Sequence, residues 1–269
     1  MVMQTLLRRR VAGKTVDEAS EVIDLRDGPD PAAPLGLVDR LVDEIDLREP
    51  SPTPPSPGPD IARPLHLYLL AQRATDLAVA VPALLMAAPV LVGVALAVRL
   101  SSRGPVLYRH ARLGRHGHSF LCLKFRSMHV DADQRLEHLL ATNPERREEW
   151  AIHHKLTDDP RITSIGAWLR RTSIDELPQL WNVIRGDMSL VGPRPITSSE
   201  TDRYGHALET VLQVKPGITG PWQVAGRNDI SYDERVVIDL RYASAPSLRT
   251  NLQVLAKTGA VVLSGRGAR

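Results

Sequence analysis

Residues Leu77–Val98 read LAVAVPALLMAAPVLVGVALAV and contain no charged side chain over 22 positions. An uncharged apolar stretch of about 18 residues or more is typical of a helix that lies in a lipid bilayer. The stretch begins far from the first residue, which is not the pattern of a secretory signal peptide. Because the sequence holds no second stretch of this kind, we expect one membrane-embedded helix rather than a transporter with many spans.

The membrane stretch contains residues that favour bending, namely Pro82, Pro89 and Gly93. Proline inside a helix removes one hydrogen bond and clashes with the preceding turn, which produces a kink. A kink near the middle leaves two alternatives: the helix spans the bilayer with a bend, or it is re-entrant and leaves by the face through which it came. Charged residues flank the stretch at Arg73, Asp76, Arg99 and Arg103. Because arginines stand at both ends, the positive-inside rule does not demand a crossing.

The composition divides the chain into three segments. Residues 1–63 are polar and include a proline-rich linker, so we expect an N-terminal extension that is largely disordered. Residues 64–103 are the membrane-associated helix. Residues 104–269 have the mixed composition of a compact folded domain.

Hydrophobic periodicity predicts the elements of this third segment. Residues 106–108 and 119–125 are expected strands of a small β-hairpin around a turn at 114–117. Helices are expected over 131–151, 165–171, 175–184, 200–211, 231–243 and 248–263. The last of them is amphipathic and suited to lie at the membrane interface. The predicted fold class is therefore α+β and mostly helical, with a kinked membrane helix followed by a compact domain.

The net charge of +3 at pH 7 is small, but its placement is uneven. Between Arg99 and Arg126 the chain has seven Lys or Arg residues and no Asp or Glu. Basic residues beside a membrane helix favour the cytoplasmic side and attract anionic lipid headgroups. No nucleic-acid recognition motif accompanies them, so we do not expect a nucleic-acid partner. The one cysteine, Cys122, excludes an internal disulfide.

The stretch Arg170–Pro195, RRTSIDELPQLWNVIRGDMSLVGPRP, carries the residues with the most chemistry. Ser173 and Glu176 have the spacing of a capping box at the start of a helix. A carboxylate at such a position would keep a low pKa and stay ionised, as a nucleophile or a metal ligand must. Asp175 and Glu176 are neighbours that do not share a helix face, so we expect different roles for them. The alternative is that these residues only stabilise the helix start.

Cationic side chains accompany these carboxylates. Arg170 lies one turn upstream, and Arg194 sits in a rigid Gly-Pro-Arg-Pro turn, where a guanidinium fork matches phosphate oxygens. Lys124 and Arg126 alternate with Phe125, so they share a face of the predicted strand, and both are further candidates to bind substrate phosphate. For each of these residues the alternative is a surface salt bridge or a solvated strand edge.

The turn-rich loop Lys215–Gly220 precedes two further polar candidates, Gln223 and Arg227. These residues either bind a base or a sugar, or pack the loop. The histidines lack ligand spacing with nearby cysteine or paired acids, so a zinc site is not expected.

From about Arg73 to Gly267 the chain resembles the bacterial sugar transferase family. Its members are monotopic polyprenyl-phosphate phosphoglycosyl transferases that initiate exopolysaccharide, capsule, O-antigen and glycoprotein glycan assembly. The strings that carry the resemblance are KFRSM (124–128), DPRIT (159–163), RRTSIDELPQ (170–179), GDMSLVGPRP (186–195) and KPGITG (215–220). Five strings in this order make the match specific.

The resemblance implies transfer of a phosphosugar from a UDP-sugar to a polyprenyl phosphate such as undecaprenyl phosphate, with release of UMP. In the family the aspartate of the Asp-Glu pair attacks phosphorus and forms a covalent phosphosugar intermediate, which makes Asp175 the expected nucleophile. Glu176 would assist with Mg²⁺ or with the lipid phosphate, and both carboxylates are candidate Mg²⁺ ligands. Arg170 and Arg194 correspond to phosphate-binding positions, and Lys124 is a weaker match for the same role.

The resemblance also favours the re-entrant alternative. Pro89 corresponds to the family's helix-breaking proline, and Arg73 and Asp76 correspond to residues at the start of the membrane helix. The catalytic domain would then lie on the cytoplasmic face of the plasma membrane. Membrane lipids are implied partners, and downstream glycosyltransferases or a second copy of the chain are further candidates. A competing hypothesis is an inactive membrane scaffold that recruits later glycosyltransferases through its polar N-terminal arm.

Overall fold

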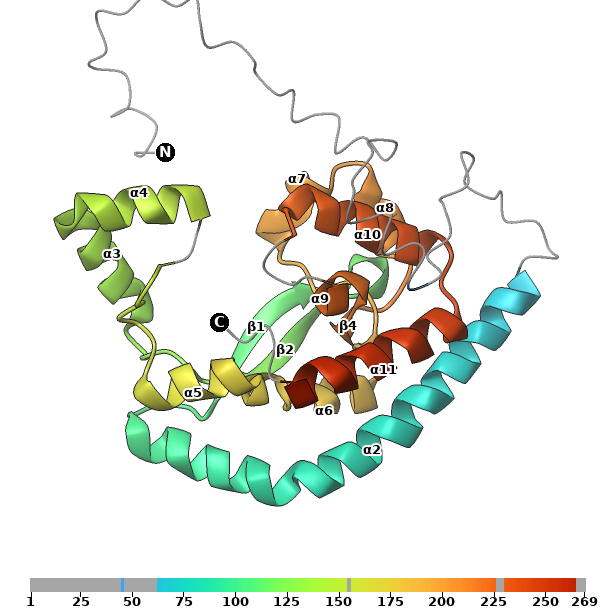
Figure 1. Ribbon diagram of the computed structural model, residues 1–269, viewed down its shortest axis with the longest axis horizontal. Coiled ribbons are helices and arrows are strands. Elements are labelled where there is room, and N and C mark those ends of the chain that lie inside the picture. The colour runs from blue at the N-terminus through green and yellow to red at the C-terminus, as the bar shows by residue number, and fades with distance from the viewer. Residues whose placement is uncertain (1–44, 46–61, 154–155, 226–229, 265–269) are drawn as a thin grey trace, which may run out of the picture.

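The computed structural model describes residues 45, 62–153, 156–225 and 230–264. The expected extension at residues 1–63 lies outside these ranges except for Ile45 and the start of helix α2, and Arg227 also lies outside them. The described residues form helices around two small sheets, with the long helix α2 along one side (Figure 1). This arrangement agrees with a mostly helical α+β fold.

Helix α2 (Ala62–Ser101) is one continuous helix of 40 residues that includes Pro82 and Pro89. Figure 1 shows that its path bends near the middle and that the other elements lie on the concave side. The two prolines therefore lie in a bent helix that does not end at either of them. Among the described residues, its part Leu67–Ser101 is the one helix long and apolar enough to cross a membrane.

The middle of α2 presents a large apolar surface. Leu85 is 70% exposed and Met86 is 80% exposed, and Val90 and Val92 are exposed on the next turn. Soluble domains rarely leave contiguous apolar side chains uncovered without a partner surface. The exposed side of the bend therefore matches the expectation of a membrane-associated helix.

The predicted β-hairpin is confirmed. Strand β1 (Leu107–Leu113) pairs antiparallel with β2 (Ser119–Phe125), with Leu107 opposite Phe125 and Leu113 opposite Ser119. The 3₁₀ turn η1 (Arg115–Gly117) joins the strands. The first strand extends five residues beyond the end of the predicted 106–108, because residues 109–113 still pair with β2.

A second sheet was not predicted. Strand β3 (Ser189–Val191) pairs in parallel with β4 (Gly217–Thr219). Two glycines permit the close approach, since a Cβ on Gly192 would collide with the backbone of Lys215 and a Cβ on Gly217 with the backbone of Gly192. The sheet thus fixes the segment after β3 against the segment before β4.

Several predicted helices are shorter than expected. The single helix predicted over 131–151 is wrong: α3 (Ala132–Thr142) ends at Asn143 and α4 (Pro144–His153) starts anew at Pro144, which is favourable only in a first turn. The helix predicted over 200–211 is divided at Gly205, whose φ is 47°. The remaining helical elements are η3 (Ser198–Glu200), α7 (Thr201–Tyr204), α8 (Ala207–Val211), α9 (Pro221–Ala225), α10 (Tyr232–Ser244) and α11 (Leu248–Ser264).

The core has two parts. The larger cluster is centred on β3, α6 (Gln179–Arg185) and α10, and it includes the fully buried Ile238 and Tyr242. The smaller cluster packs Val94 and Val98 of α2 against Phe125 of β2 and against α5 (Ser164–Thr172). The C-terminal half of α2 is therefore part of the folded domain rather than a separate anchor.

Candidate active site

Asp175 lies in the 3₁₀ turn η2 (Ile174–Glu176), between helices α5 and α6. The expected capping box is wrong: Ser173 adopts a left-handed conformation with φ 57°, ends α5, and makes no side-chain cap. Helix α6 begins only at Gln179. The Asp175 carboxylate therefore sits on a tight turn between two helices and not in the first turn of an α-helix.

Burial governs the charge of this carboxyl group. Asp175 is 8% exposed. Burial, together with the negative charge of Glu176, raises the pKa of Asp175 to about 6, although the positive charges of Lys124 and Arg170 oppose the shift. The low pKa expected from the sequence is therefore wrong, because desolvation outweighs the neighbouring cations. The group still ionises at neutral pH.

Glu176 and Asp175 have different surroundings, as expected for neighbouring positions. The Lys124 ammonium donates to the Glu176 carboxylate, with Nζ and Oε1 2.5 Å apart. Both side chains are partly exposed. The pair places a cation from β2 beside the buried Asp175.

Arg170 approaches Asp175 from the last turn of α5. Its Nε donates to the Ser127 hydroxyl at 2.9 Å. Gly166 lets α5 lie directly against the Ser127 main chain, where a Cβ would collide. At the other end, the Thr163 N–H donates to the Ser127 carbonyl at 3.1 Å. The strings KFRSM and DPRIT therefore meet in space and fix the helix that carries Arg170.

Arg194 follows β3 and is exposed, although Gly192 and Pro193 before it are buried, and the small parallel sheet holds this turn in place. The Gly217 N–H donates to the Pro193 carbonyl at 2.8 Å, and the Gly192 N–H donates to the Thr219 carbonyl at 3.0 Å. The strings GDMSLVGPRP and KPGITG are thus paired with each other.

A cleft joins most of these groups. Its lining residues are Arg112, Cys122, Lys124, Glu176, Gln179, Arg194, Pro195, Gly217, Ile218 and Gln223. Three cationic side chains, those of Arg112, Lys124 and Arg194, line the cleft, which suits an anionic ligand. Asp175 and Arg170 are not among the lining residues. Gln223, expected as a base or sugar ligand, lies in this lining. Arg112 is a cleft residue that the sequence did not single out.

Arg126 does not lie in the cleft. It is 6% exposed, and its Nη2 donates to the Ser102 main-chain oxygen at 2.7 Å and to the Ser102 hydroxyl at 2.8 Å. Strand β2 ends at Phe125, so the strand alternation that grouped Arg126 with Lys124 no longer applies. The expected phosphate-binding role is therefore corrected to one at the end of α2, where a cation offsets the terminal carbonyls.

Arg73 and Asp76 fasten the first half of α2 to the domain. Arg73 donates to the main-chain oxygens of Val183 and Ile184, each at 2.6 Å, which satisfies the C-terminal end of α6. Asp76 accepts from the Leu190 N–H and from the Ser189 hydroxyl, each at 2.9 Å. Both residues therefore join the membrane helix to the elements that carry the cleft.

Asp175 and Glu176 are the carboxylates that the sequence offers as Mg²⁺ ligands. In the ranges that the structure describes, no group of three or more His, Cys, Asp or Glu side chains comes together. Mg²⁺ usually takes one or two carboxylates together with phosphate oxygens of a substrate. Asp175 and Glu176 are two adjacent carboxylates, the number that such a site uses, and Glu176 is already paired with Lys124.

The comparisons with known proteins agree with one another. A family profile described as "Bacterial sugar transferase" matches residues 67–265. The undecaprenyl-phosphate galactose phosphotransferase of Salmonella typhimurium is 47% identical over 197 residues, which cover 73% of this chain and 41% of that protein. The exopolysaccharide production protein ExoY of Rhizobium meliloti is 45% identical over 199 residues, which cover 74% of this chain and 88% of that protein.

A third relative is the UDP-glucose:undecaprenyl-phosphate glucose-1-phosphate transferase of Escherichia coli. It is 38% identical over 194 residues, which cover 69% of this chain and 39% of that protein. The chain therefore spans about 40% of the length of the first relative named here and of this one, and most of the length of ExoY.

Proposed function

Because the chain belongs to the bacterial sugar transferase family, we propose that it transfers a sugar phosphate from a UDP-sugar to a polyprenyl phosphate. The observation that carries the proposal is the buried carboxylate of Asp175, which lies beside Lys124 and Arg170 and is the chain neighbour of Glu176 in the lining of a cationic cleft. A buried carboxylate with two cationic neighbours is suited to attack an anionic phosphorus centre, since the cations offset the repulsion between nucleophile and substrate.

The reaction balances in two displacements. In the first, an Asp175 carboxylate oxygen bonds to the sugar-bearing phosphorus, and the bond from that phosphorus to the bridging oxygen breaks. The electron pair stays with the bridging oxygen, and UMP leaves. In the second, a phosphate oxygen of the polyprenyl phosphate attacks the same phosphorus and the Asp175 oxygen departs. The product is a polyprenyl-diphosphate sugar, and the free carboxylate is restored.

The other site residues have roles consistent with their positions. Arg170 and Lys124 lie near Asp175 and would hold the transferred phosphoryl group. Asp175 and Glu176 would hold Mg²⁺ together with phosphate oxygens of the donor, and the bound ion supplies further neutralisation of the diphosphate. Gln223 lines the cleft and would contact the nucleotide or the sugar.

We further propose that α2 is re-entrant and that the cleft faces the cytoplasm. Arg73 ties the first half of α2 to α6, and Val98 near its other end is buried against the same domain. The exposed apolar side chains of Leu85, Met86, Val90 and Val92 lie between these two attachments along the helix. The two ends of a spanning helix lie on opposite sides of the bilayer, and one polar domain cannot contact both of them. The two attachments therefore support insertion from one face only.

Trapping of the intermediate tests the reaction. The protein is incubated with UDP-sugar labelled with ³²P at the sugar-bearing phosphate, without lipid acceptor. We expect label on the wild-type chain and on Asp202→Asn, a control at an exposed carboxylate, but none on Asp175→Asn. UDP-galactose and UDP-glucose are the first donors to compare, because relatives are named for these sugars. Label that survives in Asp175→Asn would remove Asp175 from the nucleophile role.

The same assay separates the enzyme from the inactive scaffold. An inactive scaffold would release no UMP from any UDP-sugar, even with polyprenyl phosphate present. The topology is tested with Leu67→Cys and Arg103→Cys, each in a Cys122→Ser background, using a membrane-impermeant thiol reagent. A re-entrant helix leaves both cysteines unlabelled in intact cells and labelled in opened membranes. A spanning helix exposes one of them outside.

A further inference from the structure

Arg112 is a second guanidinium in the cleft. It lies on β1 with its side chain 12% exposed, and it lines the cleft together with Lys124 and Arg194. Its Nη1 donates to the main-chain oxygen of Pro195 at 2.9 Å, directly after Arg194. Arg112 therefore supports the turn that carries Arg194 and adds its own charge to the same space.

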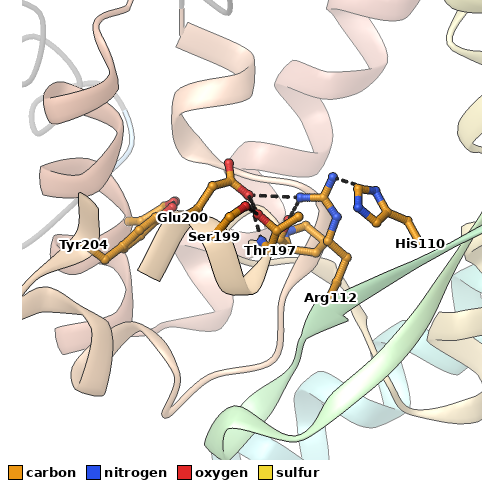
Figure 2. A network of polar contacts seen from close by, with 8 residues as sticks. His110, Arg112, Thr197, Ser199, Glu200 and Tyr204 are labelled. Atoms are coloured by element: carbon orange, nitrogen blue, oxygen red, sulfur yellow. Dashed lines mark hydrogen bonds and ion pairs between the residues drawn. The ribbon is translucent and has the colours of Figure 1, made fainter. Parts of the chain in front are cut away.

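Two side chains fix the direction of Arg112 (Figure 2). Glu200 accepts from Nη1 at 3.2 Å and is itself held by the Thr197 N–H at 2.7 Å. On the other side, Nη2 and the His110 Nδ1 are 3.1 Å apart. A guanidinium can only donate, so Nδ1 of His110 accepts, and the ring is neutral with its proton on Nε2. The guanidinium is thus oriented before any ligand arrives.

The charges around Arg112 favour a bound anion. Arg112 and Arg194 line the same cleft. Burial, and then the positive charge of Arg194, lowers the pKa of Arg112, as expected for two guanidinium groups that repel each other. Glu200 is the carboxylate that contacts Arg112, and Glu176 is paired with Lys124. An anion between Arg112 and Arg194 would relieve this repulsion.

The register of the hairpin places Arg112 away from the nucleophile. Lys124 is opposite Tyr108, and Arg112 lies four residues further along β1 on the same face. Four residues of strand separate their backbone positions by roughly 13 Å, so the two side chains enter the cleft from different points along the hairpin. Lys124 is at the Asp175 end, through its ion pair with Glu176. Arg112 is at the end nearer Pro195.

We propose that Arg112 binds the phosphate of the leaving nucleotide, a role that rests on the proposed transfer from a UDP-sugar. When Asp175 bonds to the sugar-bearing phosphorus, the broken bond leaves its electron pair on the nucleotide phosphate. That phosphate gains one negative charge, and it lies on the far side of the reacting phosphorus from Asp175. Arg112 and Arg194 stand at the end of the cleft where this charge appears.

Equilibrium binding to the full chain in detergent micelles tests this assignment without turnover. Isothermal titration calorimetry measures UMP, uridine and inorganic pyrophosphate with wild type, Arg112→Gln and Arg112→Lys. We expect Arg112→Gln to weaken UMP and pyrophosphate about tenfold or more and to leave uridine unchanged. Arg112→Lys should lie between, since it keeps the charge and loses the fork.

Two further variants separate binding from folding. Arg109→Gln removes a charge from the opposite face of the same strand and should bind all three ligands as wild type does. In the double variant Arg112→Gln with Glu200→Gln, the carboxylate that pairs with Arg112 is removed together with the cation, so no unpaired charge is left behind. This double variant should melt near the wild-type temperature and still bind UMP about tenfold less tightly.

The outcomes are distinct. Unchanged UMP affinity in Arg112→Gln, or an equal loss for uridine, overturns the assignment while leaving the proposed reaction intact. A wild-type chain that binds pyrophosphate but not UMP overturns the proposal that the donor is a nucleotide sugar. The pyrophosphate affinities of wild type and Arg112→Gln then decide whether Arg112 binds an anion. A wild-type chain that binds none of the three overturns both proposals.

Discussion

The Lys124 ammonium and the Glu176 carboxylate form an ion pair with Nζ and Oε1 2.5 Å apart, one residue from the buried Asp175. Lys124 is the first of the cations that lower the pKa of Asp175. In Lys124→Met this pKa rises, because the positive charge that lowers it most is gone. The rate of covalent labelling should therefore increase with pH over a range that lies at higher pH than in wild type.

Arg171→Met is the matched control, since Arg171 is exposed on the neighbouring helix end. Its labelling rate should follow the wild-type pH profile. A profile for Lys124→Met that is lower at every pH but not displaced would mean that Lys124 holds the donor without affecting Asp175.

Arg73 donates hydrogen bonds to the C-terminal end of α6, so its loss should weaken the attachment of α2 to the domain. Arg73→Ala leaves two carbonyls, of Val183 and Ile184, without their charged donor. We expect a loss of about 1.5–3 kcal/mol of unfolding free energy, the usual value for a hydrogen bond to a charged group. Denaturant titration in detergent micelles measures it, with the exposed Arg103→Ala as control. Equal stability of the two variants would contradict a stabilising role for the contacts between Arg73 and α6.

Gly192 tests the packing of the small parallel sheet, and Gly93 in α2 is its control. A Cβ at position 192 would collide with the Lys215 carbonyl oxygen and the Gly217 nitrogen, whereas one at position 93 meets nothing within 4 Å. Gly192→Ala should destabilise by several kcal/mol or prevent folding, since overpacking typically costs about 1–3 kcal/mol and backbone cannot yield easily. Gly93→Ala should stabilise by about 0.5–1 kcal/mol. Thermal unfolding that ranks the two in the opposite order would refute this packing.

Asp239 makes stability depend on pH. It is fully buried and accepts from the Tyr204 hydroxyl at 3.0 Å. Burial raises the pKa of Asp239 from 3.8 to about 7. Between these values the folded chain holds more protons than the unfolded chain, so this group makes stability fall as pH rises from about 4 to 7.

Asp239→Asn cannot ionise and keeps an acceptor for Tyr204. Its melting temperature should therefore fall less than that of wild type over the same pH range. Asp233→Asn, on an exposed position of the same helix, should behave as wild type does. An identical pH dependence in wild type and Asp239→Asn would show that Asp239 has the same pKa in the folded and the unfolded chain, so that its burial does not raise it.

Local patterns were sufficient for the hairpin and for most helices. Alternation around a glycine-containing turn predicted β1 and β2, and the apolar stretch predicted α2. The break between α3 and α4 was missed because the charged helical pattern continues across Asn143 and Pro144. Strands β3 and β4 were missed because three residues are too few to show a period, and their pairing depends on glycines far apart in the sequence.

The site was only partly readable for the same reason. The strings around Asp175 and Arg194 indicated which residues to consider, but the pKa of Asp175 depends on burial by distant elements. Arg126 looked equivalent to Lys124 until the strand ended between them. Arg112 stood among seven basic residues without any local feature, and only the pairing of β1 with β2 and the contact with Pro195 bring it into the cleft.

The two attachments of α2 have a mechanical consequence. A helix held at both ends by one body has no free joint at which the domain could swing relative to the lipid. A thicker or thinner bilayer must then change the inclination of the entire molecule, and the opening of the cleft moves with Leu85 and Met86 as one rigid unit. On the proposed re-entrant insertion, the depth that these two side chains reach in the bilayer sets the height of the cleft relative to the lipid headgroups.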